Sequence, residues 1–267
     1  MRRAFEAANS VGDVIYANGG ACHLNTNLLM AGDHLMDVER EAERGLAFAH
    51  KTRFGLTIEM IATQLALVRM LRGLTPQFGS LDDDQFVEVQ AERRFAQNPN
   101  LQMAECWYWV RKLQARVLSS DATAALEASR QAERLLWTSA SFLEHAEYHF
   151  YSALARALCC DSAAAEPQHT HLAALAAHQR QLDIWAQMCP ENFENRAALV
   201  GAEIARIEGR LIDAERLYEK AIRSARAQEF IHNEAVAYEL AARFYAARGF
   251  AEFADTYLRK ALSLIHI

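Results

Sequence analysis

A helical hairpin that recurs after forty residues is the sequence feature that most constrains this fold. Residues 189–227, CPENFENRAALVGAEIARIEGRLIDAERLYEKAIRSARA, carry apolar side chains at the three- and four-residue spacing of amphipathic helices, interrupted at Gly209. Forty positions later, Gly249 takes the place of Gly209 and Ala254 that of Ala214. A hairpin that repeats at a fixed period predicts a helical repeat array, because one unit cannot bury its apolar face alone.

Small residues line the predicted seam of this hairpin, where two helix backbones approach closely: Ala202, Ala205, Ala214 and Ala221. Asn192 or Asn195 is placed to cap the first helix, and Asp213 falls in the first turn of the second. The residues expected at the seam and the ends of a hairpin therefore support the periodic pattern.

Further helices are predicted upstream. Ser120, Ala125 and Ala132 have the mutual spacing of the residues at 209, 214 and 221, which predicts a hairpin of the same kind. Gly19-Gly20 is expected to interrupt the first helix, since glycine is a poor helix former. The run 82–84, three aspartates, is expected at the start of a helix that ends near residue 96.

Composition agrees with an all-α fold. Of 267 residues, 52% are hydrophobic, and only 11 are Gly and 4 are Pro, the residues that interrupt helices. No segment reads as a strand. We predict an all-α, tetratricopeptide-like superhelix of about twelve helices in five or six antiparallel hairpins, forming one repeat domain over residues 1–261.

The last residues, 262–267 (LSLIHI), look like a translated sequencing adaptor and are set aside as an artefact. We therefore expect the chain to be a fragment of a longer protein. In a repeat array cut at this point, the final helix lacks a neighbour. We expect an exposed apolar strip there at Phe253, Tyr257 and Leu258.

Charge and cysteine content limit the partners and the location. The net charge of −6 lacks the basic surface that a phosphate backbone requires, so we expect no nucleic-acid partner. The five cysteines lack the CxxC spacing of zinc sites, and we interpret them as reduced thiols of a cytoplasmic protein. The apolar stretch 54–71 contains Glu59 and Arg69, which argues against membrane insertion.

Motifs for catalysis are few. No phosphate-binding Gly-x-x-x-x-Gly-Lys-Ser/Thr segment, Gly-x-Gly-x-x-Gly loop or Gly-x-Ser-x-Gly elbow occurs. His145 and His149 have a spacing that can hold zinc, but Ala146 follows the first where a metalloprotease has Glu. A structural role is favoured for both, and we assign no catalytic residue, metal or cofactor to the segment.

One group of residues is a candidate interaction surface. Trp107, Arg111 and Gln114 lie together on one face of the helix expected over 101–119. Tryptophan and arginine are enriched at binding hot spots. The competing interpretation places Trp107 in the core between repeats.

Five segments carry a resemblance to a known group of proteins: 62–86, 106–118 (CWYWVRKLQARVL), 135–157, 189–210 and 232–250. They resemble the helical region of large bacterial multidomain sensor kinases, and the resemblance spans nearly all of 13–261. In that group, a serine/threonine-kinase-like domain and an AAA-type ATPase module precede the helical array. GAF or PAS sensory domains and a histidine kinase transmitter follow it.

The resemblance implies a non-catalytic segment that links the ATPase module to the sensor and transmitter domains, within a parent that is an ATP-dependent histidine kinase in two-component signal transduction. Its partners would be those flanking domains and a regulatory protein or peptide. The family's ATP-binding loops and phosphoacceptor His have no matching positions here. Two alternatives stay open: the sensor arm of an ATP-dependent transcription activator, and an independent enzyme that uses His145 and His149 with a metal.

Overall fold

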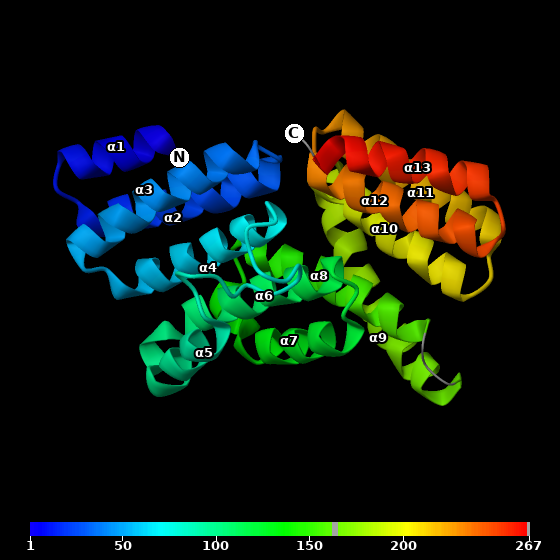
Figure 1. Cartoon of the computed structure of the whole chain (residues 1–267), viewed down its shortest axis with the longest axis horizontal. Helices are drawn as coiled ribbons and strands as arrows, with labels where there is room; N and C mark the ends of the chain where they lie inside the picture. The colour runs from blue at the N-terminus through cyan, green and yellow to red at the C-terminus, as the bar shows by residue number, and fades with distance from the viewer. Residues whose placement is uncertain (162–164, 266–267) are drawn as a thin grey trace. The chain divides into compact units, whose positions relative to one another are not determined.

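The computed structural model describes residues 1–161 and 165–265, and every regular element in that part of the chain is helical (Figure 1). The elements are α1 (Arg2–Ser10), α2 (Val14–Ala31), α3 (Leu35–Thr52), α4 (Gly55–Leu71), α5 (Glu88–Gln97), η1 (Pro99–Leu101), α6 (Gln102–Leu118), α7 (Ala122–Leu135), η2 (Leu136–Ser139), α8 (Leu143–Cys160), α9 (Ala165–Met188), α10 (Pro190–Ile207), α11 (Leu211–Ala227), α12 (Ile231–Ala247) and α13 (Ala251–Ile265). The predicted all-α architecture of helical hairpins is confirmed.

The chain divides into two compact units, Met1–Tyr148 and His149–Ile267, whose boundary falls within α8. The sequence predicted a single domain over 1–261, and the two units are described separately below. In the first unit, α1 pairs with α2, α3 with α4, and α6 with α7, while α4 also packs against α6. Its core contains six of the largest fully buried side chains of the chain: Ile61, Leu67, Met70, Leu81, Trp107 and Tyr108.

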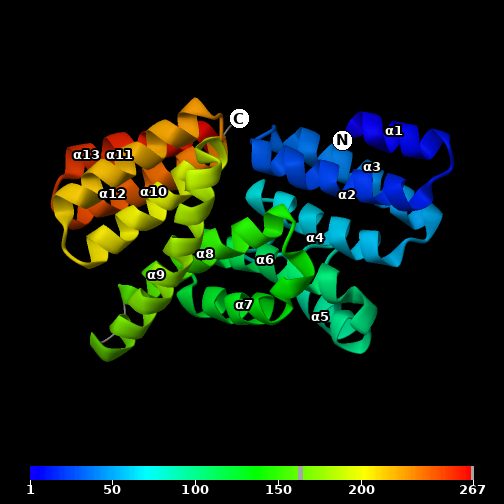
Figure 2. The same cartoon turned by 180° about the vertical axis from the view of Figure 1, so that it is seen from behind.

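The second unit shows the periodic hairpin directly. The helices α10, α11, α12 and α13 pack side by side in sequence order (Figure 2). Gly209 and Gly249 both adopt a positive φ, of 75° and 81°, at the turns α10–α11 and α12–α13. A left-handed backbone costs glycine little because it has no Cβ. The forty-residue spacing in the sequence therefore corresponds to two equivalent turns.

The predicted small-residue seam is buried as expected. Ala202, Ala205 and Ala214 have no exposed surface, and Ala221 is 1% exposed. Small side chains at these positions allow the two helix axes to approach to about 8 Å, the short end of the usual range. A polar contact also joins helices of this unit. The Asn233 side-chain amide on α12 donates a 2.8 Å hydrogen bond to Asn195 Oδ1 on α10.

Some helix boundaries differ from the sequence prediction. Helix α10 begins at Pro190 and not at Asn192 or Asn195, because proline is suited to the first helical position, where no N–H is needed. Gly19-Gly20 lies inside a continuous α2, and the break falls instead at Gly12, whose φ is +76°. Glycine thus interrupts the first helical region where a positive φ is required.

The aspartates 82–84 also precede their helix and do not begin it, since α5 starts at Glu88. They belong to the loop between α4 and α5. Asp83 Oδ1 accepts hydrogen bonds of 2.7 Å from the backbone N–H groups of Gln85 and Phe86, and Arg69 donates to its other oxygen. Asp83 therefore satisfies N–H donors of the loop, whereas Asp82 Oδ1 accepts from the N–H of Glu88, the first residue of α5.

At the end of the chain, Phe253 is 57% and Leu258 is 45% exposed, as expected for an apolar strip. Tyr257 is half-buried, and its hydroxyl donates to Glu219. The segment 262–267 continues α13 as far as Ile265, and 266–267 lie outside the described residues. No helix in 1–161 or 165–265 has the length and apolar character needed to cross a membrane.

Candidate functional site

The predicted interaction surface is buried, which corrects that prediction. Trp107 and Arg111 have no exposed surface, and Gln114 is 4% exposed. Their polar groups have partners on other elements of the same unit. Trp107 Nε1 donates a 3.2 Å hydrogen bond to Ser139 Oγ, and Gln114 Nε2 donates a 2.7 Å hydrogen bond to Glu147. The interpretation of Trp107 as core is the one that the structure supports.

Arg111 belongs to a buried polar network that joins four helices. Its Nη2 donates 2.7 Å to Glu144 Oε1 on α8, and its Nη1 donates 3.0 Å to Gln114. Thr26 on α2 donates 3.0 Å to the same Glu144 oxygen, and Gln64 on α4 donates 2.7 Å to Thr26. Burial raises the pKa of Glu144, and the Arg111 charge opposes that rise. The network holds the N-terminal end of α8 in place within the first unit.

The opposite face of α6 borders a groove of about 860 Å³ that lies between α5 and α7. The floor is formed by residues at three- and four-residue intervals, which share one helix face: Gln102, Glu105, Trp109, Lys112 and Arg116. The walls are formed by Glu92, Phe95, Ala96 and Pro99 on one side and by Ala124, Glu127, Ala128, Gln131, Arg134 and Leu135 on the other. We call this site the α6 groove.

Two of the three cations in the α6 groove are already neutralised. Lys112 Nζ lies 2.6 Å from Glu92 Oε1 and 2.7 Å from Glu88 Oε2, and also 5.1 Å from the centre of the Trp109 ring. Arg116 donates through Nη2 to both oxygens of Glu88, at 2.9 and 2.7 Å. This end of the groove therefore carries no net charge available to a ligand.

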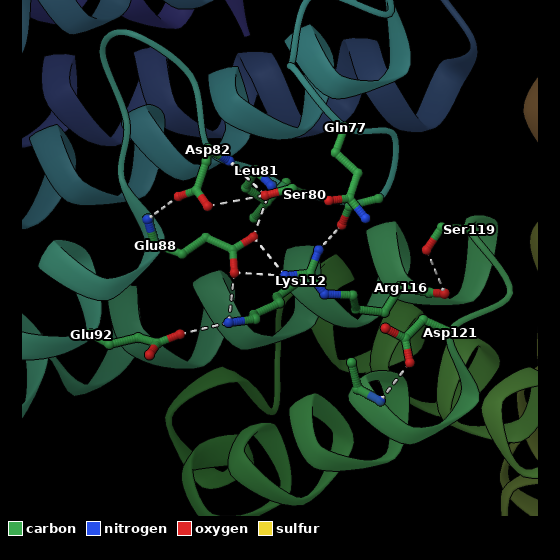
Figure 3. A network of polar contacts seen from close by, with 12 residues as sticks. Gln77, Ser80, Leu81, Asp82, Glu88, Glu92, Lys112, Arg116, Ser119 and Asp121 are labelled. Atoms are coloured by element: carbon green, nitrogen blue, oxygen red, sulfur yellow. Dashed lines mark hydrogen bonds and ion pairs between the residues drawn. The ribbon is translucent and has the colours of Figure 1, made fainter.

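Glu88 organises this end of the groove (Figure 3). Its carboxylate accepts a 2.8 Å hydrogen bond from the backbone N–H of Leu81, in addition to those from Lys112 and Arg116. Its own backbone N–H donates 2.6 Å to Asp82 Oδ1. Glu88 is only 5% exposed, so these contacts are needed to compensate for burial of its charge. They hold the α4–α5 loop against α6.

The same loop makes a close backbone contact at Gly79. Arg116 Nη1 donates to the Gly79 carbonyl oxygen, and the glycine has a φ of +92°. A Cβ at this position would lie 2.3 Å from Ser119 Oγ. Both the backbone conformation and the lack of space therefore require glycine.

The other end of the α6 groove holds two charges without an oppositely charged partner. Glu105 Oε1 accepts a 3.4 Å hydrogen bond from Trp109 Nε1, and Arg134 Nη1 donates 2.8 Å to Gln131 Oε1. Among residues 1–161 and 165–265, neither Glu105 nor Arg134 forms an ion pair. An acceptor, a donor and a half-buried indole are thus available to a bound molecule.

A smaller groove of about 570 Å³ occupies the equivalent position in the second unit, between α9, α10 and α11. In the register that aligns Ser120 with Gly209, Trp109 corresponds to Ala198, and Glu105 corresponds to Glu194. Glu194 forms an ion pair of 3.0 Å with Lys220. This second groove therefore lacks the indole, and its equivalent carboxylate is already paired.

The two histidines considered as metal ligands have other contacts. His145 Nδ1 lies 3.2 Å from the carbonyl oxygen of Ala140, and His149 Nδ1 lies 3.1 Å from His178 Nδ1. The pairing of His149 with His178 joins α8 to α9 and had no signal in the sequence spacing. In the described part of the chain, no three His, Cys, Asp or Glu side chains gather as a metal site would require.

No protein-family model matches the chain, and no curated protein matches it at a significant level. The geometry of the site is therefore the main basis for a functional proposal. The α6 groove combines an aromatic floor with one carboxylate and one guanidinium, neither of which forms an ion pair within the described residues. These are groups that bind and orient a ligand.

Proposed function

We propose that this chain is a non-catalytic helical-repeat module that binds a protein partner through the α6 groove. The observation that carries the proposal is the groove of about 860 Å³ along one face of α6, with Trp109 on its floor. Stacked hairpins present grooves of this kind as continuous binding surfaces. Aromatic residues with nearby polar groups are frequent centres of binding energy.

We further propose that the module belongs to a cytoplasmic multidomain sensor histidine kinase. There it links an ATPase module to the sensor and transmitter domains, so its partners are those flanking domains and a regulatory protein or peptide. The basis is the sequence resemblance over 13–261 together with the helical hairpins of the fold. Small rotations between packed hairpins transmit a binding event along the chain. The module itself uses no cofactor and binds no nucleic acid.

Deletion tests this role. Residues 1–261 are removed from the parent protein, and autophosphorylation is measured with and without the parent's activating ligand. We expect the ligand dependence to be lost, while basal phosphorylation persists. Ligand-dependent autophosphorylation that is the same with and without the module would refute the coupling role.

The second candidate, the sensor arm of an ATP-dependent transcription activator, uses a similar helical array. The domain that follows the module in the gene distinguishes the two. A GAF domain or a transmitter supports the kinase, and a DNA-binding helix-turn-helix supports the activator.

A further inference from the structure

We propose that the α6 groove binds an extended peptide segment of about six residues, whose apolar side chain packs on Trp109. This inference rests on the proposed partner-binding function and specifies its ligand. The groove floor runs from Gln102 to Arg116 on one helix. At 1.5 Å per residue this face is about 21 Å long, which matches about six residues of extended chain at roughly 3.3 Å each.

The charges of the groove favour a peptide backbone over an ionic ligand. Lys112 and Arg116 are paired with Glu88 and Glu92, so they have no excess charge for a phosphate or a carboxylate. Glu105 and Arg134 remain, one acceptor and one donor. A peptide group supplies the complementary N–H and C=O, and in an extended segment successive groups point in alternate directions.

Trp109 provides the anchor for a side chain of the peptide. Its ring contacts Tyr108, with centroids 5.0 Å apart, and Lys112 Nζ, so part of the indole is covered. The residue is half-buried and lines the groove together with Ala96 and Ala128 on the two walls. Alanines leave space beside the indole, and an apolar side chain that enters this space removes apolar surface from water on both partners.

The second unit provides an internal comparison. Its equivalent groove has Ala198 in place of the indole, and its carboxylate Glu194 is paired with Lys220. The groups that we assign to peptide binding are therefore present in one groove and absent from the other. One peptide is expected to bind per chain.

The test uses a phage-displayed library of linear ten-residue peptides selected against the whole 267-residue chain. Enriched peptides are synthesised with a fluorescent label, and their Kd is measured by anisotropy. We expect Trp109→Ala to weaken binding at least about tenfold, as truncation of a hot-spot aromatic does. The matched control is Trp137→Ala, because Trp137 is 70% exposed on η2 and lies outside the groove lining.

A second pair of variants guards against a folding defect in Trp109→Ala. Arg134→Ala removes the groove cation that has no ion pair and should weaken binding several-fold. Arg93→Ala, which removes an exposed cation of α5 outside the lining, should not. Both side chains are exposed, so neither change affects the core. Raising salt from 50 to 500 mM should change Kd less than about threefold, since Glu105 and Arg134 contact neutral peptide groups and not opposite charges.

Three results would overturn the inference: no enriched peptide, enriched peptides whose Kd is unchanged by Trp109→Ala and Arg134→Ala, or salt-sensitive binding of a dT10 oligonucleotide that the same variants abolish. The proposed function is tested separately by the deletion of 1–261. If that deletion removes ligand dependence while no peptide binds, only the peptide assignment fails. If the deletion has no effect, the coupling function fails, whatever the groove binds.

Discussion

His232 should make the second unit sensitive to mild acid. Both ring nitrogens are buried, and within the described residues neither has a hydrogen-bond partner. Burial lowers the pKa of His232 from 6.5 to about 3, and the nearby positive charge of Arg196 on α10 contributes in the same direction. The ring is therefore neutral in the folded protein at pH 7, and it stays neutral well below that pH.

The size of the effect follows from the pKa difference. In the unfolded chain the ring takes up a proton near pH 6.5, and in the folded chain only near pH 3. The unfolded state therefore binds more protons over this interval, and stability is lost as pH falls from 6.5 toward 3. At pH 5 the difference is about 1.5 pH units, or about 2 kcal/mol at roughly 1.36 kcal/mol per unit. His178, whose pKa is lowered to about 4, adds a loss of the same sign.

The substitution His232→Phe isolates the contribution of this ring. The free energy of unfolding in urea is measured for the wild type and the variant at pH 7.5 and pH 5.0. We expect the free energy of unfolding of the wild type to fall by about 2 kcal/mol more than that of the variant over this change in pH. At pH 7.5 the variant should be as stable or more stable, because two buried unpaired nitrogens are removed. The control is His50→Gln, on an exposed position of α3, which should keep the wild-type pH difference.

An NMR titration of the His232 ring tests its lowered pKa directly, without a measurement of stability. The His232 Cε1–H resonance should keep its neutral chemical shift from pH 8 down to pH 5. A ring that titrates near pH 6.5 in the folded protein refutes the assigned burial. Equal pH-dependent losses in the wild type and His232→Phe would refute the calculated contribution to stability.

Four further substitutions test the first unit by urea unfolding. Gly79→Ala should lower the free energy of unfolding by about 2–4 kcal/mol, because it adds a steric clash to a positive φ. Its control is Gly73→Ala, at a φ of +71° with no atom within 4 Å of the added Cβ, which should lower it by only about 1 kcal/mol. Glu88→Ala should cost about 3 kcal/mol and speed amide exchange in the α4–α5 loop, because it leaves buried donors without an acceptor. Arg111→Ala should cost about 3–5 kcal/mol, because Glu144 stays buried without its cation.

The fold was predictable because helix pairing depends on residues close together in sequence. Burial of Ala214 and Ala221 follows from their spacing on one helix face. Ser120, aligned with Gly209 by register alone, has a positive φ of 60° in the structure, as the turn requires. Periodicity and turn position are local properties, and one sequence is enough to identify them.

The position of the site was not predictable for a physical reason. Trp107 and Trp109 both precede a basic residue by one helical turn, so their local patterns are nearly alike. What separates them is Ser139 and Glu144, more than thirty positions later in the chain, which satisfy Trp107 Nε1 and Arg111 in the core. Only the tertiary contacts decide which tryptophan lies on the groove. Spacing within α6 carries no such information.

The repeats themselves indicate why binding chemistry concentrates on the groove floors. The seam residues Ala125 and Ala214 occupy equivalent positions, and both are fully buried, since larger side chains would separate the helices. At the floor position, Trp109 is half-buried in the first unit, whereas Ala198 is only 4% exposed in the second. The first groove thus has room for an indole at this position, and the second is packed closely around a small side chain. A groove ligand is therefore expected to distinguish the two units at this residue, because only the first groove presents an indole.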